Sequence, residues 1–161
     1  MSVSKSNIST KRANTSERIK ENASRAAAIL ADIKETVRVG QDTEKYLYEN
    51  LKCAVCFRLM IDADTADTDD LRKLCILSIR RQMSENEGVS DREIVRQIEK
   101  YDCHQTNLVA QKKVLLMLYI ESALSIHLDD DEATEVFTVK DLADKAGEAL
   151  RQKYAEGLPG D

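Results

Sequence analysis

Apolar residues occupy every position from Val114 to Ile120, and apolar side chains continue at helical spacing as far as Leu128. A helix that is apolar nearly all round is buried on most of its sides. The run is far too short to cross a bilayer, which takes ~20 apolar residues. We therefore predict a helix over 106–127 at the centre of a globular core, with Leu116 and Leu118 as candidates for full burial.

Apolar side chains recur three and four positions apart in five further stretches, which is the spacing of one helix face. Ser90 with Glu93, and Thr138 with Asp141, have the spacing of capping boxes at the start of a helix. The chain has only one proline and five glycines, so few positions break a helix. The sequence predicts an all-α bundle of about six helices without a sheet, near 16–38, 43–61, 69–84, 91–101, 106–127 and 139–154. We expect the apolar sides of the second and fifth helices to be the most buried.

The start of the chain differs in composition from the rest. Residues 1–14 are rich in serine, threonine, asparagine and lysine, and Lys5, Lys11 and Arg12 have no acidic neighbour before Glu17. Such a composition is typical of a disordered tail, and a basic arm or an organelle-targeting peptide is the alternative. We predict disordered tails at 1–14 and 156–161, an N-terminal helical extension at 15–62 and a C-terminal helical bundle at 67–155.

Three segments in the C-terminal part follow one another in a distinctive order. They are Leu124–Leu128, the acidic turn Asp130–Ala133, and Phe137–Leu142 with its threonine cap. In this order the chain resembles the second half of an acyl carrier protein, where a long helix, an acidic turn and a threonine-capped helix succeed each other. The resemblance implies that residues 67–155 form a carrier-like helical bundle.

The same resemblance places the family's phosphopantetheine-bearing serine at Ala110, and the nearest hydroxyl belongs to Thr106. Gln111, Lys112 and Lys113 replace the acidic residues that begin the family's long helix. The family's partners bind that acidic surface with arginine and lysine. We therefore expect a degenerate carrier-like protein without a cofactor. A genuine acyl or peptidyl carrier with an atypical attachment site is the alternative.

The cysteines and histidines are the remaining candidates for chemistry. Cys53 and Cys56 form a C-x-x-C, and Cys103 stands beside His104 further along. Their spacing does not match a common zinc module, and Cys53 and Cys56 lie in an apolar helical run, where a free cysteine packs as a small hydrophobe. Packing is the preferred interpretation. A zinc site at these four residues is the alternative.

Charge and composition restrict the class of partner. The chain has 24 basic and 29 acidic residues and a net charge of −5, whereas nucleic-acid-binding domains are usually basic. No apolar signal segment opens the sequence. Four cysteines without such a signal are typical of a reducing compartment. We expect a cytoplasmic protein whose partner is another protein rather than nucleic acid or a membrane.

No pattern of catalytic residues stands out, so the sequence favours a non-catalytic helical protein-interaction module over an enzyme. The expected interaction residues are charged side chains beside the central helix: Lys112, Lys113, Asp129, Asp130, Asp131 and Glu132. Besides the carrier, two alternatives stay open. One is a helical metal- or thiol-based regulator that uses the cysteines, and the other is a subunit of a helical assembly that makes contact through Ala23–Leu30.

Overall fold

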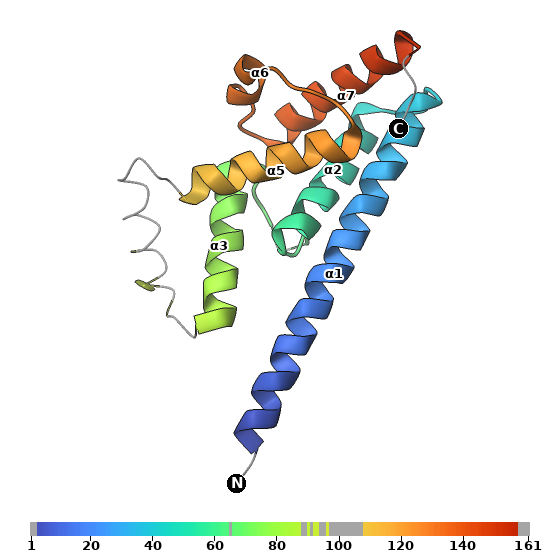
Figure 1. Ribbon diagram of the computed structural model, residues 1–161. Coiled ribbons are helices and arrows are strands. Elements are labelled where there is room, and N and C mark those ends of the chain that lie inside the picture. The colour runs from blue at the N-terminus through green and yellow to red at the C-terminus, as the bar shows by residue number, and fades with distance from the viewer. Residues whose placement is uncertain are drawn as a thin grey trace.

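The computed structural model describes residues 3–64, 66–87, 90, 92–93, 96 and 108–157. Within these residues the protein is an all-α bundle without strands, which confirms the predicted fold class. Its helices are α1 (Val3–Arg38), α2 (Glu44–Leu59), α3 (Leu71–Glu87), α5 (Leu108–Leu124), α6 (Asp130–Thr134) and α7 (Val139–Ala155) (Figure 1). None of these helices is both long and apolar enough to cross a membrane.

α1 begins at Val3 rather than near Ser16, so residues 3–14 are helical and the prediction of a disordered tail there differs from the structure. No proline or glycine precedes Gly40, and serine, threonine and asparagine each lower helix stability by less than about 1 kcal/mol. The N-terminal part of α1 extends beyond the rest of the bundle (Figure 1). Gly40, at φ +73°, then lets the chain turn back into α2.

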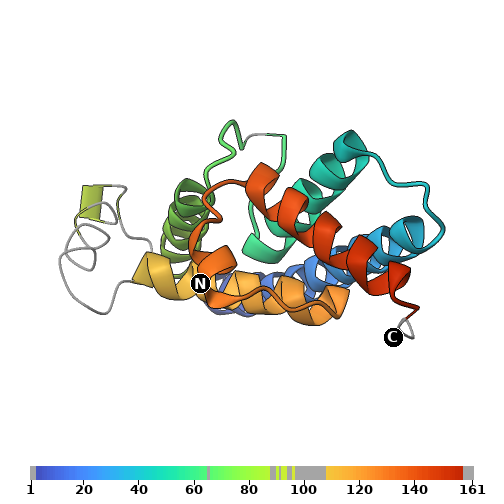
Figure 2. The same cartoon turned by 90° about the horizontal axis from the view of Figure 1, so that it is seen from above.

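One hydrophobic core joins the two parts that the sequence divides into an extension and a bundle. α2 packs on α1 and on α7, and α5 packs on α1 and α3 (Figure 2). Removing this much apolar surface from water is the main stabilising contribution to the fold. The largest fully buried side chains come from every long helix and from Val136, which lies between α6 and α7: Leu30, Ile33, Leu51, Val55, Leu71, Leu74, Ile120, Leu124, Val136, Leu142 and Leu150.

The starts of α3 and α7 are tied together. The N–H of Leu71 donates to the carbonyl of Phe137 and the N–H of Val139 donates to the carbonyl of Asp69, each at 2.9 Å. Thr138 caps α7 and forms the predicted capping box with Asp141. This junction fixes the backbone of Phe137 at the edge of the core.

The segments before and after α5 are predicted to contain a capped helix over 91–101 and an acidic turn at 130–133. The acidic turn contains the short helix α6, which Asp129 and Glu132 open with a capping box of their own. The helix predicted over 91–101 lies mostly outside the described residues. At its start the N–H of Glu93 donates to Oγ of Ser90 at 3.3 Å, as the predicted cap requires.

Candidate interaction surface

α5 has two apolar faces, of which only one is covered. Its inward face consists of buried Val109, Leu116, Met117, Ile120 and Leu124. On the outward face Val114, Leu115 and Leu118 are 56%, 67% and 55% exposed. The expectation that this helix is buried on most sides is therefore wrong, and so is the expected burial of Leu118.

The reason is architectural: α1, α3 and α7 all meet α5 from the inside of the bundle, and no described element crosses its outer side. We define the outer face of α5 as Gln111, Val114, Leu115, Leu118 and Ser122, all exposed. Polar Gln111 and Ser122 lie on this face at either end of the apolar run. From the sequence alone they do not show which side of the run is open to solvent, because Lys112, Lys113 and Glu121 flank the same run on other sides of the helix.

Phe137 is a second exposed apolar side chain, with 62% of its surface accessible. Its N–H donates to Oδ2 of Asp141 at 3.1 Å, and its carbonyl accepts from Leu71. Nζ of Lys113 lies 5.3 Å from the centre of its ring, within the range of a cation–π contact. A fixed backbone thus holds an aromatic ring outward beside α5. Phe137 is not among the interaction residues predicted from the sequence.

The two lysines predicted to mediate interaction have different surroundings. Lys112 is half-buried, and its Nζ donates to Oε1 of Gln82 on α3 at 3.1 Å. Loss of hydration lowers the pKa of Lys112, and the nearby charge of Arg58 adds to this effect. Lys113 instead lies against Phe137. Arg58, at the end of α2, lies over the Tyr119 ring of α5 at 4.3 Å and extends the basic border on the side of Lys112.

The acidic residues lie on the other side of α5, where α6 sits above it in the view of Figure 1. Asp129, Asp130 and Asp131 are exposed, while Glu132 is half-buried in its capping box. Oε1 of Glu121, on α5, accepts from the N–H of Leu128 at 3.0 Å and ties the two segments together. The outer face of α5 therefore has a basic border on the side of α2 and α3 and an acidic border on the side of α6.

Ala110 occupies the position at which the resemblance to acyl carrier proteins places the modified serine. Ala110 lies in the first turn of α5 and is exposed, but its methyl side chain has no hydroxyl that could bear a phosphodiester. Thr106, Cys103 and His104 lie outside the described residues.

Two of the cysteines, Cys56 on α2 and Cys75 on α3, are buried in the core. Burial raises the pKa of each thiol to about 11. Both are therefore protonated at neutral pH, whereas the thiolate is the nucleophile and the metal ligand. Cys53 is half-buried. In the described part of the chain, no three histidine, cysteine, aspartate or glutamate side chains are grouped closely enough to hold a metal ion.

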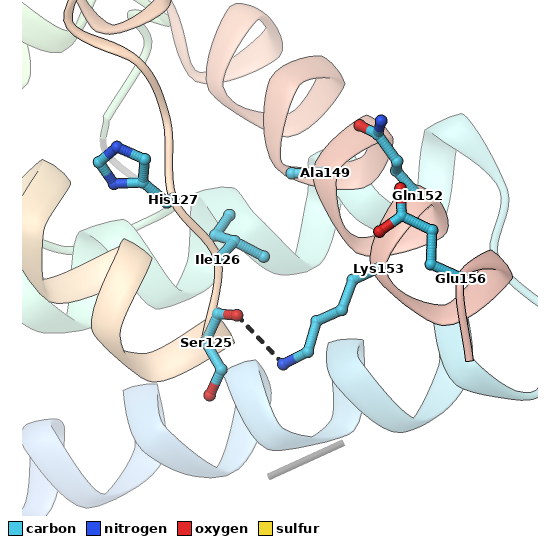
Figure 3. A pocket seen from close by; sticks show the side chains of 7 residues that line it. All are labelled: Ser125, Ile126, His127, Ala149, Gln152, Lys153 and Glu156. Atoms are coloured by element: carbon cyan, nitrogen blue, oxygen red, sulfur yellow. Dashed lines mark hydrogen bonds between the residues drawn. The ribbon is translucent and has the colours of Figure 1, made fainter. Parts of the chain in front are cut away.

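A shallow hollow lies at the C-terminal end of α5. It has a volume of about 320 Å³ and is lined by Ser125, Ile126, His127, Ala149, Gln152, Lys153 and Glu156 (Figure 3). Nζ of Lys153 donates to the carbonyl of Ser125 at 3.1 Å, and Nζ of Lys34 donates to its Oγ at 3.2 Å. Ser125 has φ +53°, so the lysines stabilise a left-handed residue that ends the helix. His127 points away from Lys153 in Figure 3. The hollow is therefore formed by the end of α5 and by the lysine contacts that stabilise it.

A larger hollow of about 490 Å³ lies between α1 and the end of α2. Nδ2 of Asn22 donates to Sδ of Met60 at 3.1 Å across it, and Arg25 lies over the Phe57 ring at 5.6 Å while also pairing with Glu21 at 2.8 Å. Its lining mixes basic, acidic and apolar side chains without a consistent charge. The outer face of α5 is the more uniform surface, and we take it as the candidate site.

No family model, no curated protein and no solved structure matches this chain.

Proposed function

We propose that the protein is a non-catalytic interaction module that binds another protein through the outer face of α5 and the neighbouring ring of Phe137. One observation carries the proposal: a helix that anchors the core with one face presents Val114, Leu115 and Leu118 to solvent on the other. Single exposed apolar residues are common, but an exposed group of them on one helix is typical of a binding surface.

The energetics favour such a contact. Fully burying a leucine side chain stabilises a complex by about 1.5–3 kcal/mol, so Leu115 and Leu118 together can supply much of the affinity of a transient complex. Both lie on a regular helix with buried anchors, and little backbone entropy is lost on binding. Charged borders on the two sides of this face are expected to orient the partner.

We propose a protein as the partner because the charges around the outer face of α5 do not suit nucleic acid. Nucleic acid requires a basic surface. Here Asp129, Asp130 and Asp131 border the face, and the whole chain has a net charge of −5.

The test is site-specific photo-cross-linking. A benzophenone amino acid in place of Leu118 should link the protein to its partner in an extract of the source cells. The same amino acid in place of Ile19, which is 51% exposed on α1, is the matched control and should give no link. Absence of any product from position 118, or the same products from both positions, would overturn the proposal.

The carrier-like origin of the C-terminal part belongs to the same proposal. In its support, α3, α5, the short α6 and the Thr138-capped α7 succeed one another in the order that the resemblance implies. Because Ala110 has no hydroxyl, we expect incubation with a broad-specificity phosphopantetheinyl transferase and coenzyme A to leave the intact mass unchanged.

The control for this second experiment is Ala110→Ser. Modification of that variant alone would support a degenerate carrier, since only the attacking hydroxyl would have been missing. A mass shift of the unaltered chain that disappears in Thr106→Val would instead establish a genuine carrier with an atypical attachment site.

A further inference from the structure

The outer face of α5 has the repeat of a helix-pairing seam. Leu108, Gln111, Leu115, Leu118 and Ser122 follow one another at alternating spacings of three and four residues. This is the a/d spacing by which two helices pack against each other. Leu108 is 37% exposed and extends the strip to the start of the helix. A strip of this width suits one partner helix better than an extended peptide.

The two borders of this strip carry opposite charge. On one side stand Arg58, placed over Tyr119, and Lys112, which reaches Gln82 of α3. On the other stand Glu121, bonded to the N–H of Leu128, and the exposed carboxylates of 129–131. Lys113 is the exception near the acidic side, and its charge lies against the ring of Phe137. A rotation of 180° about an axis parallel to α5 therefore places the basic border of one such surface against the acidic border of another.

We infer that the occupant of this face is a second copy of the same chain, with the two α5 helices packed side by side and parallel. The inference rests on the proposed function and names its partner. A two-fold axis parallel to α5 brings Leu115 and Leu118 of each copy together. It also places the acidic border of one copy against Arg58 and Lys112 of the other.

The opposite orientation is less favourable. A two-fold axis perpendicular to α5 in the plane of the contact would make the helices antiparallel and would place each acidic border against its own copy. Like charges brought together across an interface oppose association. Charge thus selects the parallel arrangement, while the apolar strip provides the attraction.

Sedimentation equilibrium over a concentration series tests the association. A contact of one helix per copy is small, so we expect a reversible dimer with a micromolar dissociation constant. Leu118→Glu should raise that constant by at least about tenfold, because it brings two unpaired carboxylates into an apolar contact. Ile19→Glu should leave it unchanged. Far-UV circular dichroism of each variant checks that the helices are intact.

Disulfide trapping tests the orientation. In a parallel pair each seam residue faces its own copy, so Gln111→Cys and Ser122→Cys should each form a covalent dimer with itself on mild oxidation. In an antiparallel pair position 111 would instead face position 122. The unaltered chain, with its native cysteines, and Glu148→Cys on the exposed side of α7 serve as controls that should form no such dimer.

A dimer that Leu118→Glu weakens, together with self-linking at both 111 and 122, supports the inference. A monomer at all concentrations, a dimer that Leu118→Glu does not affect, or linking only between 111 and 122 overturns it. A monomer that still cross-links through position 118 to a different protein would overturn the second copy as partner and leave the proposed function standing.

Discussion

At the scale of single residues, neighbours on α5 have opposite roles. Leu116 and Leu118 are two positions apart in an unbroken apolar run, yet Leu116 is 3% exposed and Leu118 is 55% exposed. Their chemistry is the same, so only the position of the packing helices distinguishes them. The distinction can be measured because truncating a side chain costs stability only where the side chain was packed.

We predict that Leu116→Ala lowers the free energy of unfolding by about 2–5 kcal/mol, since it leaves a cavity in the core. Leu118→Ala should change it by no more than about 0.5 kcal/mol, as is usual at the surface. Urea titration followed by circular dichroism gives both values. Equal costs at the two positions would show that the outer face of α5 is covered in the isolated protein.

The buried thiols make stability depend on pH in the alkaline range. Burial raises the pKa of Cys56 and Cys75 from 9.0 to about 11, so the unfolded chain ionises these thiols first. Their contribution to stability is fully present below the unfolded pKa and is lost as the pH rises through the folded value. Between about pH 9 and 11 the unaltered chain should therefore lose more stability than Cys75→Ala does. Urea unfolding at several pH values measures the difference, and parallel curves for the two proteins would contradict it.

At the scale of elements, the residues at the helix ends determine where a helix begins. Thr138 accepts from the N–H of Asp141 at 3.0 Å, and the carboxylate of Asp141 accepts from the N–H groups of Phe137 and Thr138, each at 3.1 Å. Those hydrogen bonds, that of Phe137 first, lower the pKa of Asp141. The cap therefore starts α7 and also holds the segment that displays Phe137.

Thr138→Ala should lower the free energy of unfolding by about 0.5–2 kcal/mol, the usual cost of removing an N-cap hydroxyl. The control is Asp144→Ala, an exposed position later in α7 whose partner is Lys140. Thermal unfolding compares the variants.

The stabilisation from the ionised Asp141 is present above the unfolded pKa and is lost as the pH falls through the lowered folded value. Asp141→Asn should consequently destabilise the protein at neutral pH, and the difference from the unaltered chain should shrink in strong acid. A difference that stays constant with pH would show that the carboxylate is not ionised in its role as a cap.

At the scale of the whole molecule, α2 and α7 approach closely because residue 147 is a glycine. A Cβ atom at Gly147 would come within 2.8 Å of Cδ1 of Leu47, whose side chain is buried. A glycine inside a helix costs roughly 1 kcal/mol relative to alanine. The close packing of two helices distant in sequence offsets that cost.

Gly147→Leu should destabilise the protein by about 1–3 kcal/mol by overpacking this contact, in spite of the better helix propensity of leucine. Glu148→Leu, one position along on the exposed side of α7, should have little effect. Urea unfolding decides between them, and a neutral result at Gly147 would mean that α2 and α7 separate without loss of stability.

The sequence by itself determined the fold class and most of the helices. The periodicity of apolar residues, the scarcity of glycine and proline, and the Thr138–Asp141 spacing are local properties, and local hydrogen bonding obeys them. The same local rules located the start of α1 wrongly and missed α6. Serine and threonine near residue 16 resemble a cap but do not stop a helix, and an acidic turn with its own cap is long enough for a single helical turn.

Only the tertiary structure decided which side of α5 faces solvent. The run from Val114 to Ile120 is apolar on every side, so its pattern does not predict which side faces the core. The direction comes from α1, α3 and α7, which approach from one side and leave Leu115 and Leu118 uncovered. Phe137 and Arg58 join the surface for the same reason, since contacts between distant segments bring them beside α5. A pattern along one helix cannot specify where its neighbours in space will pack.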